Sequence, residues 1–148
     1  MTRDEALVAI GEANRNHQRH ELCDRLRHMD DTEVFQVFFP IAIEPPPRRG
    51  ALDAACLLFI VKPNCPISCK DAIRAMLASW DISLEELPWY LAGHFGKEAI
   101  QNAVEELSQE ALSHGQKVRL DTVTYWSNIF FALPPERLLE VEKRALDE

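Results

Sequence analysis

Apolar residues recur every three or four positions along much of the chain, and residues 69–80 show this spacing most clearly. Because an α-helix turns once in about 3.6 residues, side chains at this spacing lie on one face. Ser68 directly precedes the segment and Asp71 follows three residues later, an arrangement typical of a capped helix start. The segment is therefore expected to be an amphipathic helix whose apolar face carries Cys69, Ala72, Ile73, Met76, Leu77 and Trp80.

The first residues of the chain also carry helix signals. Thr2 and Glu5 have the spacing of a capping box, in which a hydroxyl and a carboxylate satisfy free amides at a helix start. The apolar positions that follow are interrupted by the polar stretch 14–21 and end at Asp30. They predict either one bent helix or two helices. These positions are Leu7, Ile10, Ala13, Leu22, Leu26 and Met29.

Four more helices are expected in the second half of the chain. Ser83 and Glu86 form another capping box, and Pro88 is expected to strain or kink that helix near its start. Gly115 is expected to stop the next helix, and Pro135 suits the first turn of the last one. The expected helices cover residues 84–95, 97–112, 123–133 and 135–146.

Residues 34–43 are harder to assign. They are rich in β-branched and aromatic side chains, which favour strands, but Pro40 removes a hydrogen-bond donor from any strand built across it. We interpret the segment as a short buried helix broken at Pro40. The alternative is a two-stranded pairing of residues 34–43 with 55–61, although alanines near the start of the second segment favour a helix there. The proline-rich stretch 44–50 is expected to be a loop.

Together these patterns predict an all-α fold of about eight short helices, arranged as a compact orthogonal helical bundle or as short stacked helical hairpins. An α+β fold with a two-stranded element in residues 34–61 is the alternative. The 148 residues match one typical domain, and a chain of this length buries about 70% of the surface that it exposes when unfolded. A single globular domain spanning residues 1–148 is expected, without a repeat of fixed period.

The charge of the chain indicates which classes of binding partner to expect. The formal net charge is -8, and most of the acidic excess lies in residues 98–148. Nucleic-acid binders carry clustered Lys and Arg that neutralise phosphates, whereas no basic cluster here exceeds pairs such as Arg48 and Arg49. Nucleic-acid binding is therefore not expected, and a basic protein partner would suit the acidity.

Membrane association is not expected either. The longest apolar run, residues 54–61, is far shorter than the roughly 20 residues that a membrane helix needs. The first residues include Asp4, Glu5 and Glu12 and lack the hydrophobic stretch of a secretory signal. A cytoplasmic protein is the expectation, in which the four cysteines stay reduced and form no structural disulfides.

The stretch HQRHELC, from His17 to Cys23, contains residue types that bind zinc. On a helix, His20 shares a face with both His17 and Cys23. The distant Cys65 and Cys69 could complete a set of four nitrogen and sulfur ligands. The spacing differs from that of structural zinc sites, however, and Cys69 lies on the apolar stripe of its helix. We therefore expect surface histidines and buried cysteines, with no metal and no cofactor.

Two other histidines lie in patterns that occur in enzymes. His28 precedes Asp30 and Asp31, but metal-dependent phosphohydrolases use an adjacent His-Asp pair, and acidic residues at a helix junction commonly serve as caps. His94 lies between Gly93 and Gly96, where a glycine at a helix end explains the pattern without catalysis. Phosphate-binding glycine loops, nucleophile elbows and dinucleotide fingerprints are absent from the sequence.

Two surfaces favour binding. Trp89 and Tyr90 lie beside the apolar stripe of their helix, so at least one of them is expected to point away from the core, as interface residues do, although partly buried packing of these rings is the more common arrangement. Acidic residues cluster on the following helix, where Lys97 is the only base nearby in sequence. These acidic residues are Glu98, Glu105, Glu106 and Glu110.

The leading hypothesis is a non-enzymatic, intracellular protein–protein interaction domain with an acidic helical surface. An inhibitor- or immunity-type protein that covers the active site of a basic partner is one form of this hypothesis, and the sequence leaves homo-oligomer formation open. The alternative is a small metal-dependent or hydrolytic enzyme. Its candidate residues are His17, His20, Cys23, His28, Asp30 and Asp31.

Overall fold

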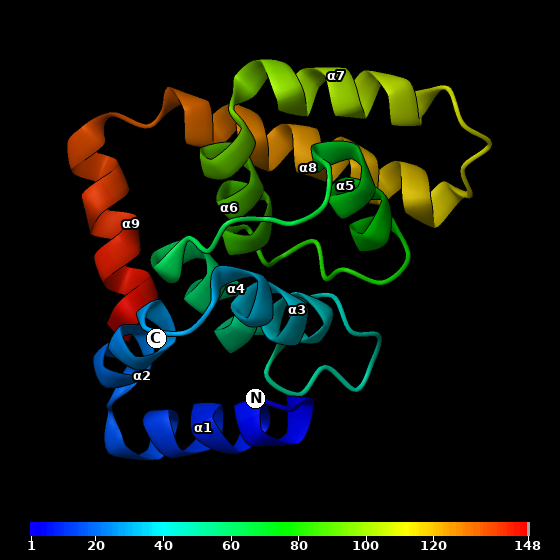
Figure 1. The fold of residues 1–148 in the computed structure, drawn as a ribbon. Coiled ribbons are helices and arrows are strands. Elements are labelled where there is room, and N and C mark those ends of the chain that lie inside the picture. The colour runs from blue at the N-terminus through cyan, green and yellow to red at the C-terminus, as the bar shows by residue number, and fades with distance from the viewer. Residues whose placement is uncertain (148) are drawn as a thin grey trace.

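The computed structural model describes residues 1–147, and within this range the chain forms nine α-helices and no strand (Figure 1). The all-α prediction is confirmed, and the alternative with a two-stranded element in residues 34–61 is wrong. The helices are α1 (Arg3–Asn16), α2 (Arg19–Arg27), α3 (Asp31–Ala42), α4 (Ala51–Val61), α5 (Cys69–Leu77), α6 (Glu86–Phe95), α7 (Lys97–Ser108), α8 (His114–Ala132) and α9 (Pro135–Asp147).

The helices form two groups that meet at α4 and α6 (Figure 1). Helices α1 to α4 form one group and α5 to α8 form the other. Helix α9 leaves the end of α8, runs along one side of the molecule, and packs against α4 and α2. Buried apolar side chains from every helix join one hydrophobic core.

Helix α4 is apolar apart from Asp53, and neighbouring helices surround most of it. It packs against α2, α3, α6 and α9, and a helix that is apolar all round is typical of a protein interior. Gly50 precedes the helix with a φ of 82°, and a Cβ there would lie 3.1 Å from Leu7 Cδ2, so both conformation and space favour glycine. Within residues 1–147, no helix is both long and apolar enough to cross a membrane.

Helix α3 corrects the expected break at Pro40, because the helix continues through this residue to Ala42. Pro40 is exposed, whereas its neighbours Phe39 and Ile41 are buried. Proline deprives the carbonyl of Gln36 of its usual donor, but Gln36 is exposed as well, so water can replace the missing N–H. The helix therefore continues past Pro40 with one backbone carbonyl left to solvent.

The N-terminal pattern forms two helices rather than one bent helix. Thr2 caps α1 in the expected capping box, and α1 ends at His17, whose φ of 53° is left-handed. Arg19 then begins α2 and is only 5% exposed. Its guanidinium pairs with Asp53 of α4 and donates to the carbonyl of Ala145 in α9 at 2.6 Å. Arg19 thus connects α2, α4 and α9.

The start of α5 agrees with the sequence, whereas the start of α6 does not. The Ser68 hydroxyl accepts from the N–H of Asp71 at 3.1 Å, as expected of a cap. Ser83 does not cap α6, because its N–H and hydroxyl both bond to the Asp81 carboxylate, at 3.0 and 2.8 Å. The helix begins three residues later, which places Pro88 in its first turn, where proline is tolerated.

Gly115 does not stop a helix. Helix α7 already ends at Ser108, and Gly115 is the second residue of α8. The start of α8 is fixed by a capping box that the sequence patterns did not reveal. The Ser113 hydroxyl accepts from the N–H of Gln116 at 3.2 Å, and the Gln116 side chain accepts from the N–H of Ser113 at 2.9 Å.

Replacing Ser113 with alanine is expected to lower the free energy of unfolding by about 1 kcal/mol, because an amide at the start of α8 loses its acceptor. Ser108→Ala is the matched control and is expected to have a smaller effect, since the Ser108 hydroxyl bonds only to the Glu105 carbonyl within α7. Urea denaturation followed by circular dichroism measures both variants. Equal loss of stability in the two would contradict the assigned start of α8.

Candidate functional site

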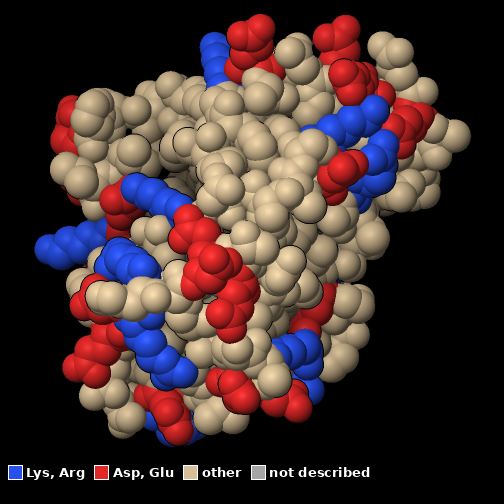
Figure 2. All heavy atoms as spheres, viewed as in Figure 1, with Lys and Arg blue, Asp and Glu red and all other residues tan. Residues whose placement is uncertain are grey.

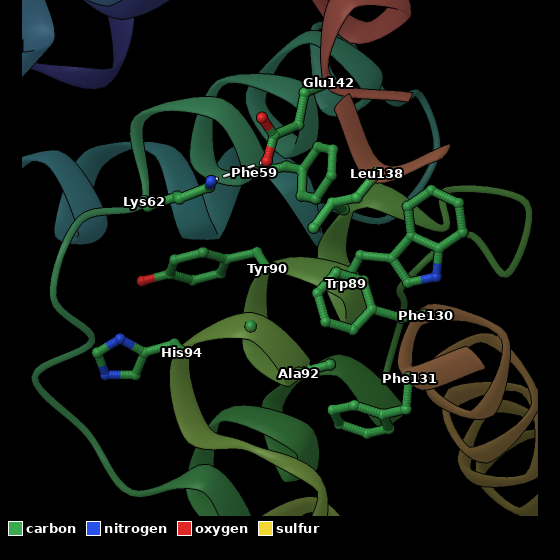
Figure 3. Close-up of a pocket in the computed structure, with 11 residues that line it drawn as sticks. Phe59, Lys62, Trp89, Tyr90, Ala92, His94, Phe130, Phe131, Leu138 and Glu142 are labelled. Atoms are coloured by element: carbon green, nitrogen blue, oxygen red, sulfur yellow. Dashed lines mark hydrogen bonds and ion pairs between the residues drawn. The ribbon is translucent and has the colours of Figure 1, made fainter. Parts of the chain in front are cut away.

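A pocket with a volume of about 520 Å³ lies between α4, α6, α8 and α9 (Figure 3). Small-molecule sites in proteins commonly have volumes in this range. Aromatic side chains from α4, α6 and α8 form much of its wall, together with one ion pair and one histidine. These residues are Phe59, Trp89, Tyr90, Phe130 and Phe131, with Lys62, Glu142 and His94.

The two aromatic residues that the sequence indicated, Trp89 and Tyr90, both line this pocket. The expectation that one of them points away from the core is wrong, since Trp89 is 6% exposed and Tyr90 is 3% exposed. The Trp89 indole donates to the carbonyl of Trp126 at 2.8 Å, and the Tyr90 hydroxyl donates to the carbonyl of Pro63 at 2.7 Å. Both rings are therefore held in place before any ligand binds.

Helix α6 positions these rings because it packs against α4 on one side and α8 on another. The centroid of the Trp89 ring lies 5.9 Å from that of Phe59 in α4 and 6.3 Å from that of Phe130 in α8. Such distances are typical of favourable aromatic contacts. Burial raises the pKa of the Tyr90 hydroxyl, which stays a neutral donor. A connected set of rings thus extends across three helices.

Lys62 and Glu142 supply the charged groups of the pocket. Lys62 ends α4 in a left-handed conformation with a φ of 57°, and its ammonium lies 2.8 Å from the Glu142 carboxylate of α9. In Figure 3 this pair lies above the Tyr90 ring, and His94 lies below it. The His94 Nε2 accepts from the N–H of Cys65 at 3.4 Å, and its ring stacks with Tyr90 at 6.2 Å between centroids.

The histidines and cysteines considered for zinc do not form a metal site. His17 ends α1 and His20 lies in α2, and both are exposed, whereas Cys23 is fully buried. Cys65 precedes α5 and Cys69 begins it, in the other group of helices. Across residues 1–147, no group of three or more His, Cys, Asp and Glu side chains is arranged to hold a metal ion.

His28, Asp30 and Asp31 have separate structural roles. The Nδ1 of His28 lies 2.7 Å from a backbone carbonyl one turn earlier in α2. Asp30 caps α3 by accepting from the N–H of Glu33 at 3.2 Å. Asp31 accepts from the N–H of Asn64 at 3.0 Å. Helix capping and backbone contacts therefore account for these three side chains without catalysis.

None of the four cysteines forms a disulfide within residues 1–147, and all of them are buried. Burial raises the pKa of the Cys23 and Cys65 thiols, and it raises the pKa of Cys69 to about 11. A thiol acts as a nucleophile or metal ligand only after it ionises. These three thiols therefore stay protonated near neutral pH.

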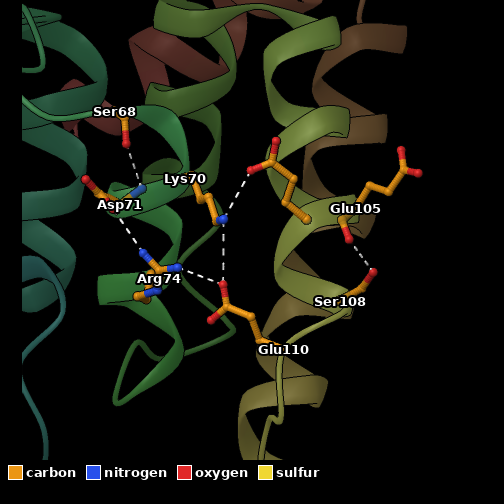
Figure 4. A network of polar contacts seen from close by, with 8 residues as sticks. Ser68, Lys70, Asp71, Arg74, Glu105, Ser108 and Glu110 are labelled. Carbon is orange, nitrogen blue, oxygen red and sulfur yellow. Dashed lines mark hydrogen bonds and ion pairs between the residues drawn. The ribbon is translucent and has the colours of Figure 1, made fainter.

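Helix α5 supplies bases to the acidic surface that the sequence predicts on α7. Lys70 lies 3.1 Å from the Glu106 carboxylate and 3.7 Å from that of Glu110 (Figure 4). Arg74 lies 2.7 Å from the Glu110 carboxylate, and its hydrogen bond lowers the pKa of Glu110. Glu110 itself follows the end of α7. Two of the four predicted acidic residues are therefore already paired.

Glu98 and Glu105 remain as the unpaired part of that surface. Both are exposed on α7, and neither forms an ion pair within the described part of the chain. Figure 2 shows Lys and Arg beside Asp and Glu in several parts of the visible face, with a broad area between them that carries neither. The acidic character of α7 is therefore local and depends mainly on these two glutamates.

Sequence patterns did not reveal several pocket residues. Phe130 lies on a stripe that predicts a helix, but nothing in the sequence connects this stripe with Phe59. Lys62 and Glu142 lie 80 positions apart, and no local signal indicates that they meet. Only the packing of α9 against α4 brings them together.

Comparison of the chain with models of protein families, with curated proteins and with solved structures finds no match. The function of the pocket is therefore inferred from its own chemistry. It offers preformed aromatic surface, a carboxylate that is paired with a lysine, and an imidazole that already accepts a hydrogen bond.

Thiol burial predicts a loss of stability in alkaline solution. The pKa of a cysteine thiol in the unfolded chain is about 8.5, whereas the pKa of Cys69 in the folded protein is about 11. Between these values the folded state retains protons that the unfolded state has released, so the free energy of unfolding falls as the pH rises. Urea titrations at several pH values measure this slope. Cys69→Ala is expected to make it shallower, and an unchanged slope would contradict the explanation.

Proposed function

We propose that this chain is a non-enzymatic protein-interaction domain that receives a side chain of its partner in the pocket between α4, α6, α8 and α9. The observation that carries the proposal is the preformed aromatic wall, in which Trp89 and Tyr90 are fixed by hydrogen bonds to backbone carbonyls. A site that is already ordered loses little side-chain entropy on binding. Protein interfaces commonly place one large side chain into a desolvated pocket of this kind.

The acidic charge of the chain supports the proposal that its partner is basic. The chain carries a net charge of -8, and Glu98 and Glu105 are exposed on α7 without an ion pair among residues 1–147. Opposite charge on a partner accelerates association and helps to fix its orientation. An inhibitor- or immunity-type protein that covers a basic active site fits this description.

The enzyme alternative lacks comparable support. A nucleophile needs a base within hydrogen-bond reach, and the buried thiols of Cys23, Cys65 and Cys69 are held in the protonated form. Asp30 is engaged as a helix cap, and Asp31 accepts from a backbone amide. No observation on these residues favours a reaction over their structural roles.

Filling the pocket is expected to abolish partner binding. Gly93 lines the pocket within α6, and a Cβ added to it would lie 3.5 Å from Phe130 Cζ, an ordinary van der Waals distance. Gly93→Ala is therefore expected to bind as the wild type does, whereas Gly93→Leu places a branched side chain in the pocket. Both variants replace a helical glycine and gain helix propensity, so the fold is expected to be kept.

The wild type and the two Gly93 variants are immobilised and exposed to an extract of the source cells, and mass spectrometry quantifies the retained proteins. A basic protein is expected to bind to the wild type and to Gly93→Ala, and its retention by Gly93→Leu is expected to fall at least about tenfold. Calorimetry with that purified partner then gives the affinities. Equal binding to Gly93→Leu would show that the pocket is not the contact site.

Reversing the charge on α7 is expected to slow association with the same partner. The Glu98→Lys/Glu105→Lys double variant is expected to reduce the association rate by about tenfold at low salt, with a smaller effect at high salt. The control is Glu12→Lys/Glu21→Lys, which makes the same change of net charge on exposed residues of α1 and α2. Stopped-flow measurements compare the two. Equal slowing by both pairs would leave only a general effect of net charge.

A further inference from the structure

We propose further that the side chain received in this pocket is cationic, a lysine or arginine of a basic protein, and that Glu142 is its counter-ion. This inference rests on the proposed function, because it names the chemistry of the group that the same pocket receives. In the free protein, the Lys62 ammonium occupies the place that the partner's cation takes.

A carboxylate beside an aromatic wall is a setting that attracts a cation. Glu142 extends from α9 to the pocket that Phe59, Trp89 and Tyr90 line (Figure 3). The face of an aromatic ring carries negative electrostatic potential, and the attraction of a cation to it grows when water is displaced. The Glu142 side chain is 24% exposed, so water screens its charge only in part. Ring faces and carboxylate therefore favour the same charge.

Lys62 shows that an ammonium fits beside Glu142. Its Nζ lies 2.8 Å from the Glu142 carboxylate, which is its only ion-pair partner in the described part of the chain. The Lys62 side chain is 60% exposed, and an ion pair with one such partner contributes little to stability. The lysine can turn into water on its long side chain. An incoming cation can therefore replace it at small cost.

The remaining groups at the pocket do not favour another charge. An anion could pair with Lys62, but it would have to displace the Glu142 carboxylate and would meet the negative faces of the rings, in a chain whose net charge is -8. A neutral apolar group would contact the rings but would gain nothing from Glu142. The Nε2 of His94 already accepts from the N–H of Cys65, so it is engaged within the protein. A cation is the occupant that Glu142 and the ring faces both attract once Lys62 has turned away.

The probes for this inference are n-butylammonium, which reproduces the end of a lysine side chain, and n-butanol, its neutral analogue. Each is titrated at constant ionic strength, and NMR follows the amides of the pocket residues Ala92 and Gly93. The dissociation constant of n-butylammonium is expected to be about tenfold lower than that of n-butanol, because only the cation gains charge–charge attraction to Glu142 and cation–π attraction to the ring faces.

Two variants make opposite changes at the site. Glu142→Gln is expected to weaken n-butylammonium binding about fivefold, and Lys62→Gln is expected to strengthen it about threefold because the carboxylate is then free. Neither variant is expected to change n-butanol binding. The controls are Glu140→Gln and Lys143→Gln, which make the same changes of charge on exposed residues of α9 and are expected to bind as the wild type does.

The outcomes separate this inference from the proposed function. If n-butanol shifts the pocket amides at the same concentrations as n-butylammonium, and Glu142→Gln alters neither, the cation site is wrong while an apolar pocket remains. If neither probe shifts these amides, both proposals fall. A gain for n-butylammonium with Lys62→Gln, together with a loss with Glu142→Gln, supports the exchange of one cation for another.

Discussion

The burial of α4 on nearly every side is the constraint on which the rest of the structure depends. Because residues 54–60 of α4 are all buried, α2, α3, α6 and α9 pack against it, and the two groups of helices meet there. Its one acidic side chain, Asp53, is paired with the buried Arg19, which also holds the end of α9 through the carbonyl of Ala145. The pocket follows from this arrangement, since α6 and α9 reach α4 from different sides and α8 closes the space beside α6.

Much of this fold could be predicted from local patterns, and the failures have local physical causes. Helix α5 could be predicted because its apolar spacing and its cap at Ser68 both indicate a helix that starts at the same place. The predicted cap at Ser83 is wrong because the N–H and the hydroxyl of Ser83 both donate to the nearby carboxylate of Asp81. Pro40 misled because the one carbonyl that it leaves without a donor, that of Gln36, is exposed to water, and Gly115 misled because it lies in the first turn of α8 rather than after a helix.

The site was less accessible to prediction, because it depends on contacts between distant segments. Trp89 and Tyr90 could be singled out from their type and position, but their direction depends on α4 and α8, which lie on either side. The pairing of Lys62 with Glu142 joins the end of α4 to α9 and leaves no trace in either local sequence. The same limit explains why α7 looked more acidic than it is, since its bases come from α5.

The position of α9 links binding to local folding. Of the described residues of α9, only Ala145 is buried, yet the helix supplies Glu142 and Leu138 to the pocket. A segment with few buried contacts opens at a lower free energy than the core does. A ligand that contacts both Glu142 and the rings binds only while α9 is docked, and by mass action it stabilises that docked state. If the pocket binds as proposed, its occupancy and the docking of α9 are therefore one coupled equilibrium, in which the ligand stabilises the docked helix.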